Sequence, residues 1–309
     1  RLVATGERVR AANILIATGA SPSLGPPIPG IEHVISSNEV FYLREFPRRI
    51  LIQGGSYIAV EFACIFAGLG AQVSLVYRGD NILRGFDDDL RHQVRVEMEK
   101  RGVHVITGST VTAVEPMGKQ FSVQLSSGGL TVTADQVMFA LGRPPNVAGL
   151  ELDKAGVALD GNGAIAVNEY SRTSVPHVYA VGDVTNRINL TPVAIREGHA
   201  FADSTFGSRS WTVDHAMIAS AVFTTPEIGT VGLSEAQAVA AGHAVKVFES
   251  GCRTMKAAIS GRQERVYMKL VVDATTDKVL GVHILGHDAG EIVQAVAIAV
   301  TMGATKADF

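Results

Sequence analysis

A chain of 309 residues is long enough for two or three domains, each with its own core. Apolar residues make up 47% of it and glycine is abundant at 32, which is typical of α/β proteins and argues against a disordered or fibrous one. The net charge of -3 arises from 27 basic and 30 acidic residues spread along the chain, so no basic stripe indicates nucleic acid. We therefore expect small molecules as partners.

The sequence shows no obvious targeting signal or membrane-spanning segment. No apolar run reaches the roughly 18 residues of a membrane helix, and residues 1–10 lack the apolar core of a signal peptide, so we expect a cytoplasmic protein that does not enter membranes. Cys64 and Cys252 form no CxxC pair, and the nine scattered histidines predict no metal site. Because the chain starts without methionine and stops just after a helical pattern, we expect it to be a portion of a longer protein.

The first half contains a strand, turn, helix, strand unit. An apolar run at 14–17 predicts a strand that enters a proline-rich loop crossing between domains. A strand at 50–52, a glycine turn at 54–56, a helix at 58–69 and a strand at 73–77 then form a βαβ unit. This order predicts a parallel sheet.

The pattern continues with an amphipathic helix at 88–100 and a strand at 103–106. Alternating antiparallel strands follow over 111–132 with a turn at Gly128-Gly129, and a run at 136–141 closes the domain. We interpret the acidic run 87–89 as charge that complements the helix dipole.

The second half predicts the end of another nucleotide-binding domain and then an α+β domain. A strand at 178–181 ends at Gly182-Asp183, and a helix follows over 192–206. A hairpin of 269–273 with 279–285 precedes a helix at 289–302.

The turn Gly54-Gly55-Ser56-Tyr57-Ile58-Ala59 matches the dinucleotide fingerprint G-x-G-x-x-A, except that Ser56 occupies the second glycine position. The pyrophosphate approaches the backbone closely at this turn and sits on the helix N-terminus, so little side chain is tolerated. Glycine turns also occur for packing alone, but the flanking strand and helix favour dinucleotide binding here.

The cofactor preference follows from the end of the next strand. NAD-binding units carry an acidic residue there for the ribose hydroxyl, whereas this sequence has Tyr77-Arg78 and then Arg84. Guanidinium groups offer planar, permanently charged donors for a 2′-phosphate, so we expect NADPH rather than NADH. The alternative is a pair of solvated loop arginines.

Other candidate residues are less specific. Thr18-Gly19 and Gly182-Asp183 each end a strand, where ligands bind in two-dinucleotide proteins. Asp183 could accept hydrogen bonds from a polyol such as a ribityl chain, or it could simply cap a turn. Glu61 lies four residues after Tyr57 on the same helix face, and is either paired or partly exposed. We predict Cys64 to be a core residue and Cys252 an incidental exposed thiol.

Taken together, the sequence resembles the glutathione reductase branch of the pyridine nucleotide-disulfide oxidoreductases. The resembling stretches follow the family's order and cover nearly the whole chain: ILIATGASP, GGSYIAVEFACIFAGLG, VYRGDNILRGFDDDLR, ALGRPPN, EYSRTSVPHVYAVGDVTNRINLTPVAIREG, FTTPEIGTVGLSE, MKAAISGR and GATKADF.

This resemblance implies an α/β fold with two Rossmann-like domains, an FAD domain split around an inserted NADPH domain, and an α+β dimerisation domain. The implied boundaries are 1–46 and 168–216 for the two FAD parts, 47–167 for the NADPH domain and 217–309 for the dimer interface. It further implies a homodimer in which NADPH reduces FAD, FAD reduces an active-site disulfide, and the dithiol reduces glutathione disulfide.

Residue roles are also implied by position. The residues matching the NADPH site are Gly54, Ser56, Ile58, Glu61, Arg78, Arg84 and Gly142, with Tyr57 as the ring that covers the flavin face. The FAD contacts would be Thr18, Gly19, Asp183 and Thr191, the last through its backbone amide, and Glu61 would pair with a lysine outside this chain.

The departures from the family pattern bear on activity. The family's CxxxxC disulfide and its His-Glu acid-base pair match no segment of this chain, so we assign no catalytic residue and expect the chain alone to be inactive. His199 lies where some members have an arginine toward glutathione. The alternatives are a dihydrolipoamide dehydrogenase or mercuric reductase, of which Arg78 and Arg84 argue against the former, and a noncatalytic nucleotide-binding or interface module.

Overall fold

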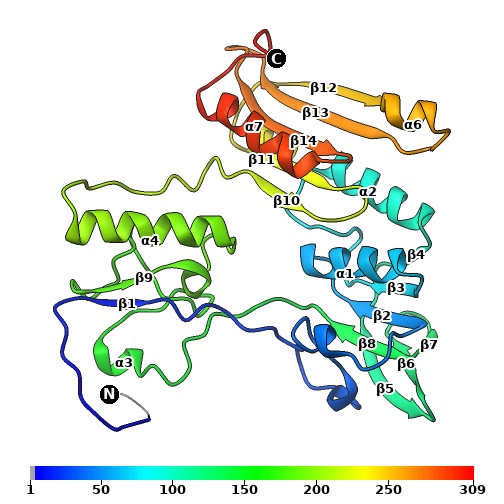
Figure 1. Cartoon of the computed structure of the whole chain (residues 1–309), viewed down its shortest axis with the longest axis horizontal. Helices are drawn as coiled ribbons and strands as arrows, with labels where there is room; N and C mark the ends of the chain where they lie inside the picture. The colour runs from blue at the N-terminus through cyan, green and yellow to red at the C-terminus, as the bar shows by residue number, and fades with distance from the viewer. Residues whose placement is uncertain (1–3) are drawn as a thin grey trace. The chain divides into compact units, whose positions relative to one another are not determined.

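The computed structural model describes residues 4–309, which divide into two compact units (Figure 1). Unit 1 contains the residues up to Pro22 and Arg143–His215, and unit 2 contains Ser23–Gly142 and Ala216–Phe309. None of the helices in this described part of the chain meets the length and apolarity that crossing a bilayer requires.

Unit 1 is built on a parallel pair of strands, β1 (Ile14–Ile16) and β9 (Val178–Ala180). Its helical elements are α3 (Leu152–Ala155), the 3-10 turn η3 (Gly182–Thr185) and α4 (Thr191–Phe206). Apolar residues of α3, β9, η3 and the segment between α3 and β9 form its core, including Leu152, Val178 and Val184. The turn η3 comes just after the buried strand β9, at the kind of strand end where ligands bind.

The first part of unit 2 is a four-stranded parallel sheet with the order β4-β3-β2-β8. Its strands are β2 (Arg49–Gln53), β3 (Gln72–Val76), β4 (Val103–Ile106) and β8 (Gln136–Phe139), and the helices are α1 (Tyr57–Gly68) and α2 (Asp88–Lys100). Leu51 and Ile52 are fully buried because the sheet is covered on both faces.

Further elements complete this part of unit 2. The strands β5 (Val111–Met117), β6 (Gln120–Leu125) and β7 (Thr131–Ala134) form an antiparallel sheet. The 3-10 turns η1 (Ile31–His33) and η2 (Glu39–Tyr42) belong to residues 23–46, whose Ile35 exchanges backbone hydrogen bonds with Val137 and Phe139 at 3.0 and 2.9 Å. Residues 23–46 therefore belong to unit 2, and residues 143–167 belong to unit 1.

The last part of unit 2 is a five-stranded antiparallel sheet with the order β10-β11-β14-β13-β12. Its elements are β10 (Ser220–Val222), β11 (Ile228–Gly232), α5 (Glu235–Ala240), β12 (Val245–Cys252), α6 (Met255–Ile259), β13 (Val266–Asp273), β14 (Val279–Leu285) and α7 (Ala289–Thr301). Helix α7 packs on the sheet through Ala289, Val293 and Ala297. The predicted α+β segment, its hairpin and its last helix are confirmed.

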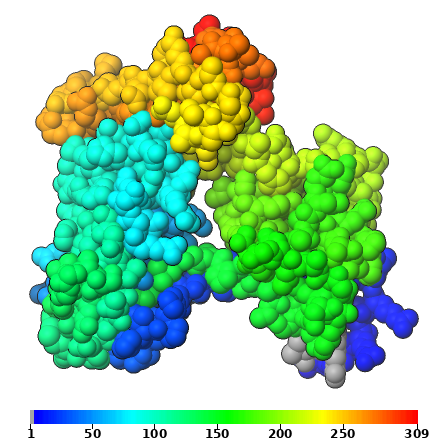
Figure 2. Space-filling model, turned by 180° about the vertical axis from the view of Figure 1, so that it is seen from behind, coloured from blue at the N-terminus to red at the C-terminus, as the bar shows by residue number. Residues whose placement is uncertain are grey.

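A buried lysine joins the two parts of unit 2. Lys269 of β13 donates to Asp87 at 3.0 Å, to Glu235 at 2.8 Å and to Asp89, and both Lys269 and Asp87 are 1% exposed. Figures 1 and 2 show α2 beside the C-terminal sheet, consistent with this link. The acidic run thus does more than the predicted dipole compensation, since only Asp87 caps α2, through the Asp89 amide.

The charge state of Asp87 follows from these contacts. Burial alone would raise the pKa of Asp87, but the Glu235 amide and the Lys269 ammonium outweigh burial and lower it. The same carboxylates raise the pKa of Lys269 against the effect of its own burial, while burial lowers the pKa of the neighbouring His283. Both partners of the Asp87–Lys269 pair are therefore charged at neutral pH.

We expect Asp87→Asn to destabilise the protein by about 1–3 kcal/mol at pH 7, since Asn keeps the helix cap but loses the charged bond to Lys269. The folded pKa of Asp87 lies below its unfolded value of about 3.9, so its contribution is fully present above the unfolded value and is lost as pH falls below it and through the folded pKa. Denaturant unfolding from pH 7 to pH 3 measures the difference in free energy of unfolding between the variant and the unmutated protein. A difference that stays constant with pH would contradict the pairing.

Candidate functional site

A cleft of about 730 Å³ lies at the carboxyl ends of β2, β3 and β8. This is the edge of a parallel sheet where ligands bind, and its volume is within the range of small-molecule sites. Five of the predicted dinucleotide residues line it: Gly54, Ser56, Arg78, Arg84 and Gly142. These residues are up to 88 positions apart in the sequence, and the order of the strands brings them to one edge of the sheet.

The glycine turn is shaped by close backbone approach. A Cβ atom on Gly54 would lie 2.4 Å from the Ala140 carbonyl oxygen, and its φ of 151° suits only glycine. On Gly55, a Cβ atom would lie 2.5 Å from the Tyr77 ring. These two positions need glycine for packing as well as for ligand approach, and the Leu83 amide donates to the Gly55 carbonyl at 2.6 Å.

Ser56 stands at the first turn of α1. It is the N-cap residue with φ -88°, its hydroxyl makes no capping hydrogen bond, and it is exposed. The backbone is therefore unstrained by the serine, and the side chain faces the cleft with its hydroxyl available to a ligand. Tyr57 follows as the first helical residue and is 37% exposed.

Two arginines supply positive charge at the cleft. Arg78 directly follows Tyr77 at the end of β3, and Arg84 lies in the loop before α2. Both are exposed, and within residues 4–309 neither guanidinium forms an ion pair or a hydrogen bond with the protein. Two free guanidinium groups at one rim suit a phosphate group.

Ile58 and Glu61 do not line this cleft. Ile58 packs against the core, and the Glu61 carboxylate accepts the Phe223 amide of the C-terminal part at 2.9 Å. Burial raises the pKa of Glu61. Glu61 is half-buried and accepts a backbone amide, so it combines features of both sequence alternatives.

The predicted flavin contacts of unit 1 lie at strand ends. Thr18 and Gly19 follow β1 and are held by Asn146, whose side-chain amide donates to the Thr18 carbonyl at 2.9 Å, while the Thr18 hydroxyl donates to the Asn146 carbonyl at 2.7 Å. Asp183 lies in η3, half-buried, and its carboxylate has no hydrogen-bond partner in the described part of the chain. Thr191 is the first residue of α4, where backbone amides lack intrahelical partners.

The turn bearing Asp183 is anchored by Glu197, which sequence reasoning missed. Glu197 of α4 is 1% exposed and accepts the Gly182 amide at 2.7 Å, the Arg187 guanidinium at 2.9 Å and His215 Nε2 at 2.8 Å. Nearby, the Asn189 Oδ1 atom is buried without a partner among the described residues. An acidic residue on the buried face of a predicted helix is the signal that could have revealed this anchor.

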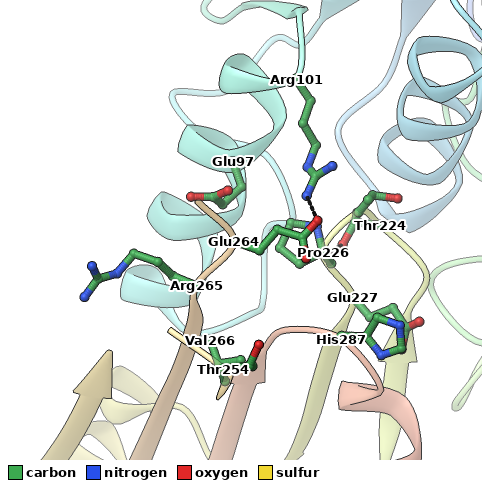
Figure 3. A pocket seen from close by; sticks show the side chains of 11 residues that line it. Glu97, Arg101, Thr224, Pro226, Glu227, Thr254, Glu264, Arg265, Val266 and His287 are labelled. Atoms are coloured by element: carbon green, nitrogen blue, oxygen red, sulfur yellow. Dashed lines mark hydrogen bonds and ion pairs between the residues drawn. The ribbon is translucent and has the colours of Figure 1, made fainter. Parts of the chain in front are cut away.

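A second cavity of about 120 Å³ lies between α2 and the C-terminal sheet (Figure 3). Arg101 and Glu264 face each other in it at 3.8 Å, and Glu97, Glu227 and His287 also line it. None of the predicted site residues is among its lining residues. Its mixture of carboxylates and guanidinium groups is typical of a solvated gap between packed segments.

The cysteines match their predicted environments. Cys64 is buried in α1, where burial raises the pKa of its thiol, whereas Cys252 ends β12 and is exposed. A buried thiol with a raised pKa is a poor nucleophile. The part of the chain that the structure describes contains no cluster of His, Cys, Asp and Glu suited to a metal ion.

Comparison with known proteins places this geometry in a family. The sequence profile of the pyridine nucleotide-disulphide oxidoreductases matches residues 2–198, and that of their dimerisation domain matches residues 218–309. The chain belongs to this family. The dimerisation profile covers the C-terminal sheet and α7, in agreement with the predicted architecture of nucleotide-binding domains followed by a dimerisation domain.

Several relatives of this oxidoreductase are known by name. Glutathione reductase of Burkholderia cepacia is 52% identical over 100% of this chain and 68% of its own length, and that of Nostoc sp. is 50% identical over 99% and 70%. Trypanothione reductase of Trypanosoma congolense is 45% identical over 98% and 62%. The solved HOCl-induced flavoprotein disulfide reductase RclA from Escherichia coli is 29% identical, with a TM-score of 0.86 over 95% of this chain and 68% of that one.

We expect Gly54→Ala to destabilise the protein by about 1–3 kcal/mol, because the methyl group meets the Ala140 carbonyl and the backbone has positive φ. Gly68→Ala is the matched control, since nothing lies within 4 Å of its Cβ position and it belongs to helix α1. The control is expected to be neutral or more stable by up to about 1 kcal/mol. Thermal unfolding of both variants measures this, and equal melting temperatures would refute the packing argument.

Proposed function

We propose that this protein acts in the NADPH-dependent reduction of glutathione disulfide, with FAD as its bound cofactor. The observation that carries the proposal is the identity of 52% and 50% with two glutathione reductases along essentially the whole chain. The cleft with its free Arg78 and Arg84 supports the choice of NADPH. Arginine is suited to a 2′-phosphate because it stays charged and donates in a fork geometry.

The cleft residues fit a dinucleotide phosphate. Gly54 leaves the backbone open to close approach, Ser56 offers a hydroxyl and the first turn of α1, and the two arginines offer charge. We assign Gly54, Ser56, Arg78, Arg84 and Gly142 to NADPH binding. By family position we add Tyr57 and Ile58 near the nicotinamide end, and Glu61 as the carboxylate of that helix face.

Unit 1 offers matching groups for FAD. The unpartnered Asp183 carboxylate suits a polyol, and Thr191 presents a backbone amide at the start of α4. Thr18 and Gly19 complete the proposed contacts at the end of β1. Bound FAD supplies the electron transfer between a nicotinamide and a disulfide.

We assign no catalytic residue among residues 4–309. Cys64 is buried with a raised thiol pKa, and Cys252 is on a different element of unit 2, so the two do not form an exchanging dithiol. What this chain contributes is binding and orientation: unit 2 holds the dinucleotide, and unit 1 holds FAD through its strand ends.

The architecture proposed with this function has four segments. FAD-binding segments at 1–46 and 168–216 flank an NADPH domain at 47–167, and residues 217–309 form the dimer interface of a homodimer, to which the dimerisation profile at 218–309 corresponds. We further propose that the protein works in the cytoplasm, on a small-molecule disulfide.

The activity is tested by transplanting residues 1–309 in place of the matching segment of the Burkholderia cepacia enzyme. We expect the chimera to consume NADPH faster when glutathione disulfide is added, and residues 1–309 alone to show no such stimulation because they lack an exchanging dithiol. A folded, flavin-loaded chimera that responds to trypanothione disulfide and not to glutathione disulfide would overturn the substrate assignment.

We expect replacement of Arg78 and Arg84 by Ala to remove most of the preference for NADPH over NADH. Each phosphate contact of a guanidinium contributes about 1.5–3 kcal/mol, whereas NADH has no 2′-phosphate to lose. Titration of the chain with both dinucleotides measures the ratio of dissociation constants. Arg262→Ala, at an exposed arginine of unit 2 that lies outside the cleft, is the matched control. Equal binding of both dinucleotides by the unmutated chain would contradict the assignment.

A further inference from the structure

The loop that carries Arg84 is fixed firmly on the side that precedes this residue. Ile82 and Leu83 are 0% and 1% exposed, and the Leu83 amide donates to the Gly55 carbonyl of the glycine turn at 2.6 Å. Arg91 of α2 donates to the Ile82 carbonyl at 2.7 Å. All of these contacts are made by residues that precede Arg84 in the chain.

The side that follows Arg84 has fewer constraints of its own. Gly85 has φ 99°, a conformation that glycine adopts without strain. Phe86 packs against the core, and its amide donates to the Leu83 carbonyl at 3.1 Å. The next residue is Asp87, which begins α2 as its N-cap. Asp87 therefore fixes the distal end of the short Arg84 loop.

Asp87 in turn is held by the C-terminal sheet. Its Oδ1 atom accepts from Lys269 at 3.0 Å and its Oδ2 atom accepts the Glu235 amide at 3.1 Å. Lys269 also binds the Asp89 and Glu235 carboxylates, and its ammonium is 1% exposed. A buried ammonium with three carboxylate partners cannot shift without leaving a charge unpaired, which makes this a rigid point.

We propose that Lys269, a residue of the dimerisation segment, is a positioning residue for the 2′-phosphate of the dinucleotide, acting through Asp87 on the Arg84 loop. The proposal rests on the NADPH assignment above. Lys269 is fully buried and lines no part of the cleft, so it acts indirectly, through Asp87, which lies three residues after Arg84 in the chain. Selection of the phosphorylated cofactor would thereby depend on the neighbouring sheet.

This role has a signature that a purely structural role lacks. Loss of folding removes all dinucleotide binding in the same proportion, whereas misplacement of the Arg84 loop weakens only ligands that carry a 2′-phosphate. The pair 2′,5′-ADP and 5′-AMP isolates that group, because the two probes differ only in it. The glycine turn, which binds the part they share, lies between β2 and α1, and its hydrogen bond to this loop is made by Leu83, on the side that precedes Arg84.

The test measures dissociation constants of both probes for the full chain and for Lys269→Met. We expect 2′,5′-ADP to bind about tenfold more weakly to the variant, and 5′-AMP to change by less than about twofold. Lys278→Met, at an exposed lysine directly before β14, is the matched control and is expected to change neither constant. Arg84→Ala shows the size of the full effect.

A second variant separates the loss of this interaction from a loss of folding. Asp87→Asn with Lys269→Met removes the buried charge from both sides while Asn retains the helix cap, and it is expected to show the same selective loss. If a folded Lys269 variant binds both probes equally more weakly, or shows no change, the role of Lys269 is overturned. The NADPH assignment still stands in that case if Arg84→Ala shows a selective loss of 2′,5′-ADP binding. Equal affinity of the unmutated chain for both probes overturns that assignment, and the inference with it.

Discussion

The ammonium group of Lys269 is the interaction on which unit 2 depends most, because it is a full charge removed from water. Burying an ammonium costs several kcal/mol unless carboxylates surround it, and here Asp87, Asp89 and Glu235 do so from two separate segments. The parallel sheet and the C-terminal sheet are therefore not simply in apolar contact. Their relative placement within unit 2 is specified by a directional, charged bond that few alternative packings would satisfy.

The glycine turn adds a second constraint of a different kind. Gly54 and Gly55 bring β2 so close to Ala140 and Tyr77 that no side chain fits, and the same closeness leaves the cleft open above the strand ends. Packing and ligand access thus rest on one pair of residues. Ser56 can replace the next family glycine because its backbone lies in an ordinary extended conformation and its side chain is exposed at the cleft.

Local patterns predicted much of this molecule. The parallel sheet, the helix at 88–100 and the strand at 103–106 follow from apolar periodicity, and their bounds agree with the structure. Strands β10, β11 and β12 were not predicted, because two of them are short and β12 is mostly exposed, so neither alternation nor a continuous apolar run marks them. Gly54, Ser56 and Arg78 could be predicted because they belong to the fingerprint turn and to the end of the next strand, whereas Gly142 followed from the family resemblance alone.

What the sequence could not predict are pairings between distant segments. Nothing near Lys269 indicates its partners: it interrupts the otherwise apolar run 266–272, and the Asp89 and Glu235 carboxylates lie 180 and 34 positions away. Glu61 is a similar case, because its partner is a backbone amide of Phe223, which carries no signal in the residue type. Buried charges of this kind must be satisfied by something, so an unpaired charge in a predicted core is itself a prediction that a remote segment packs there.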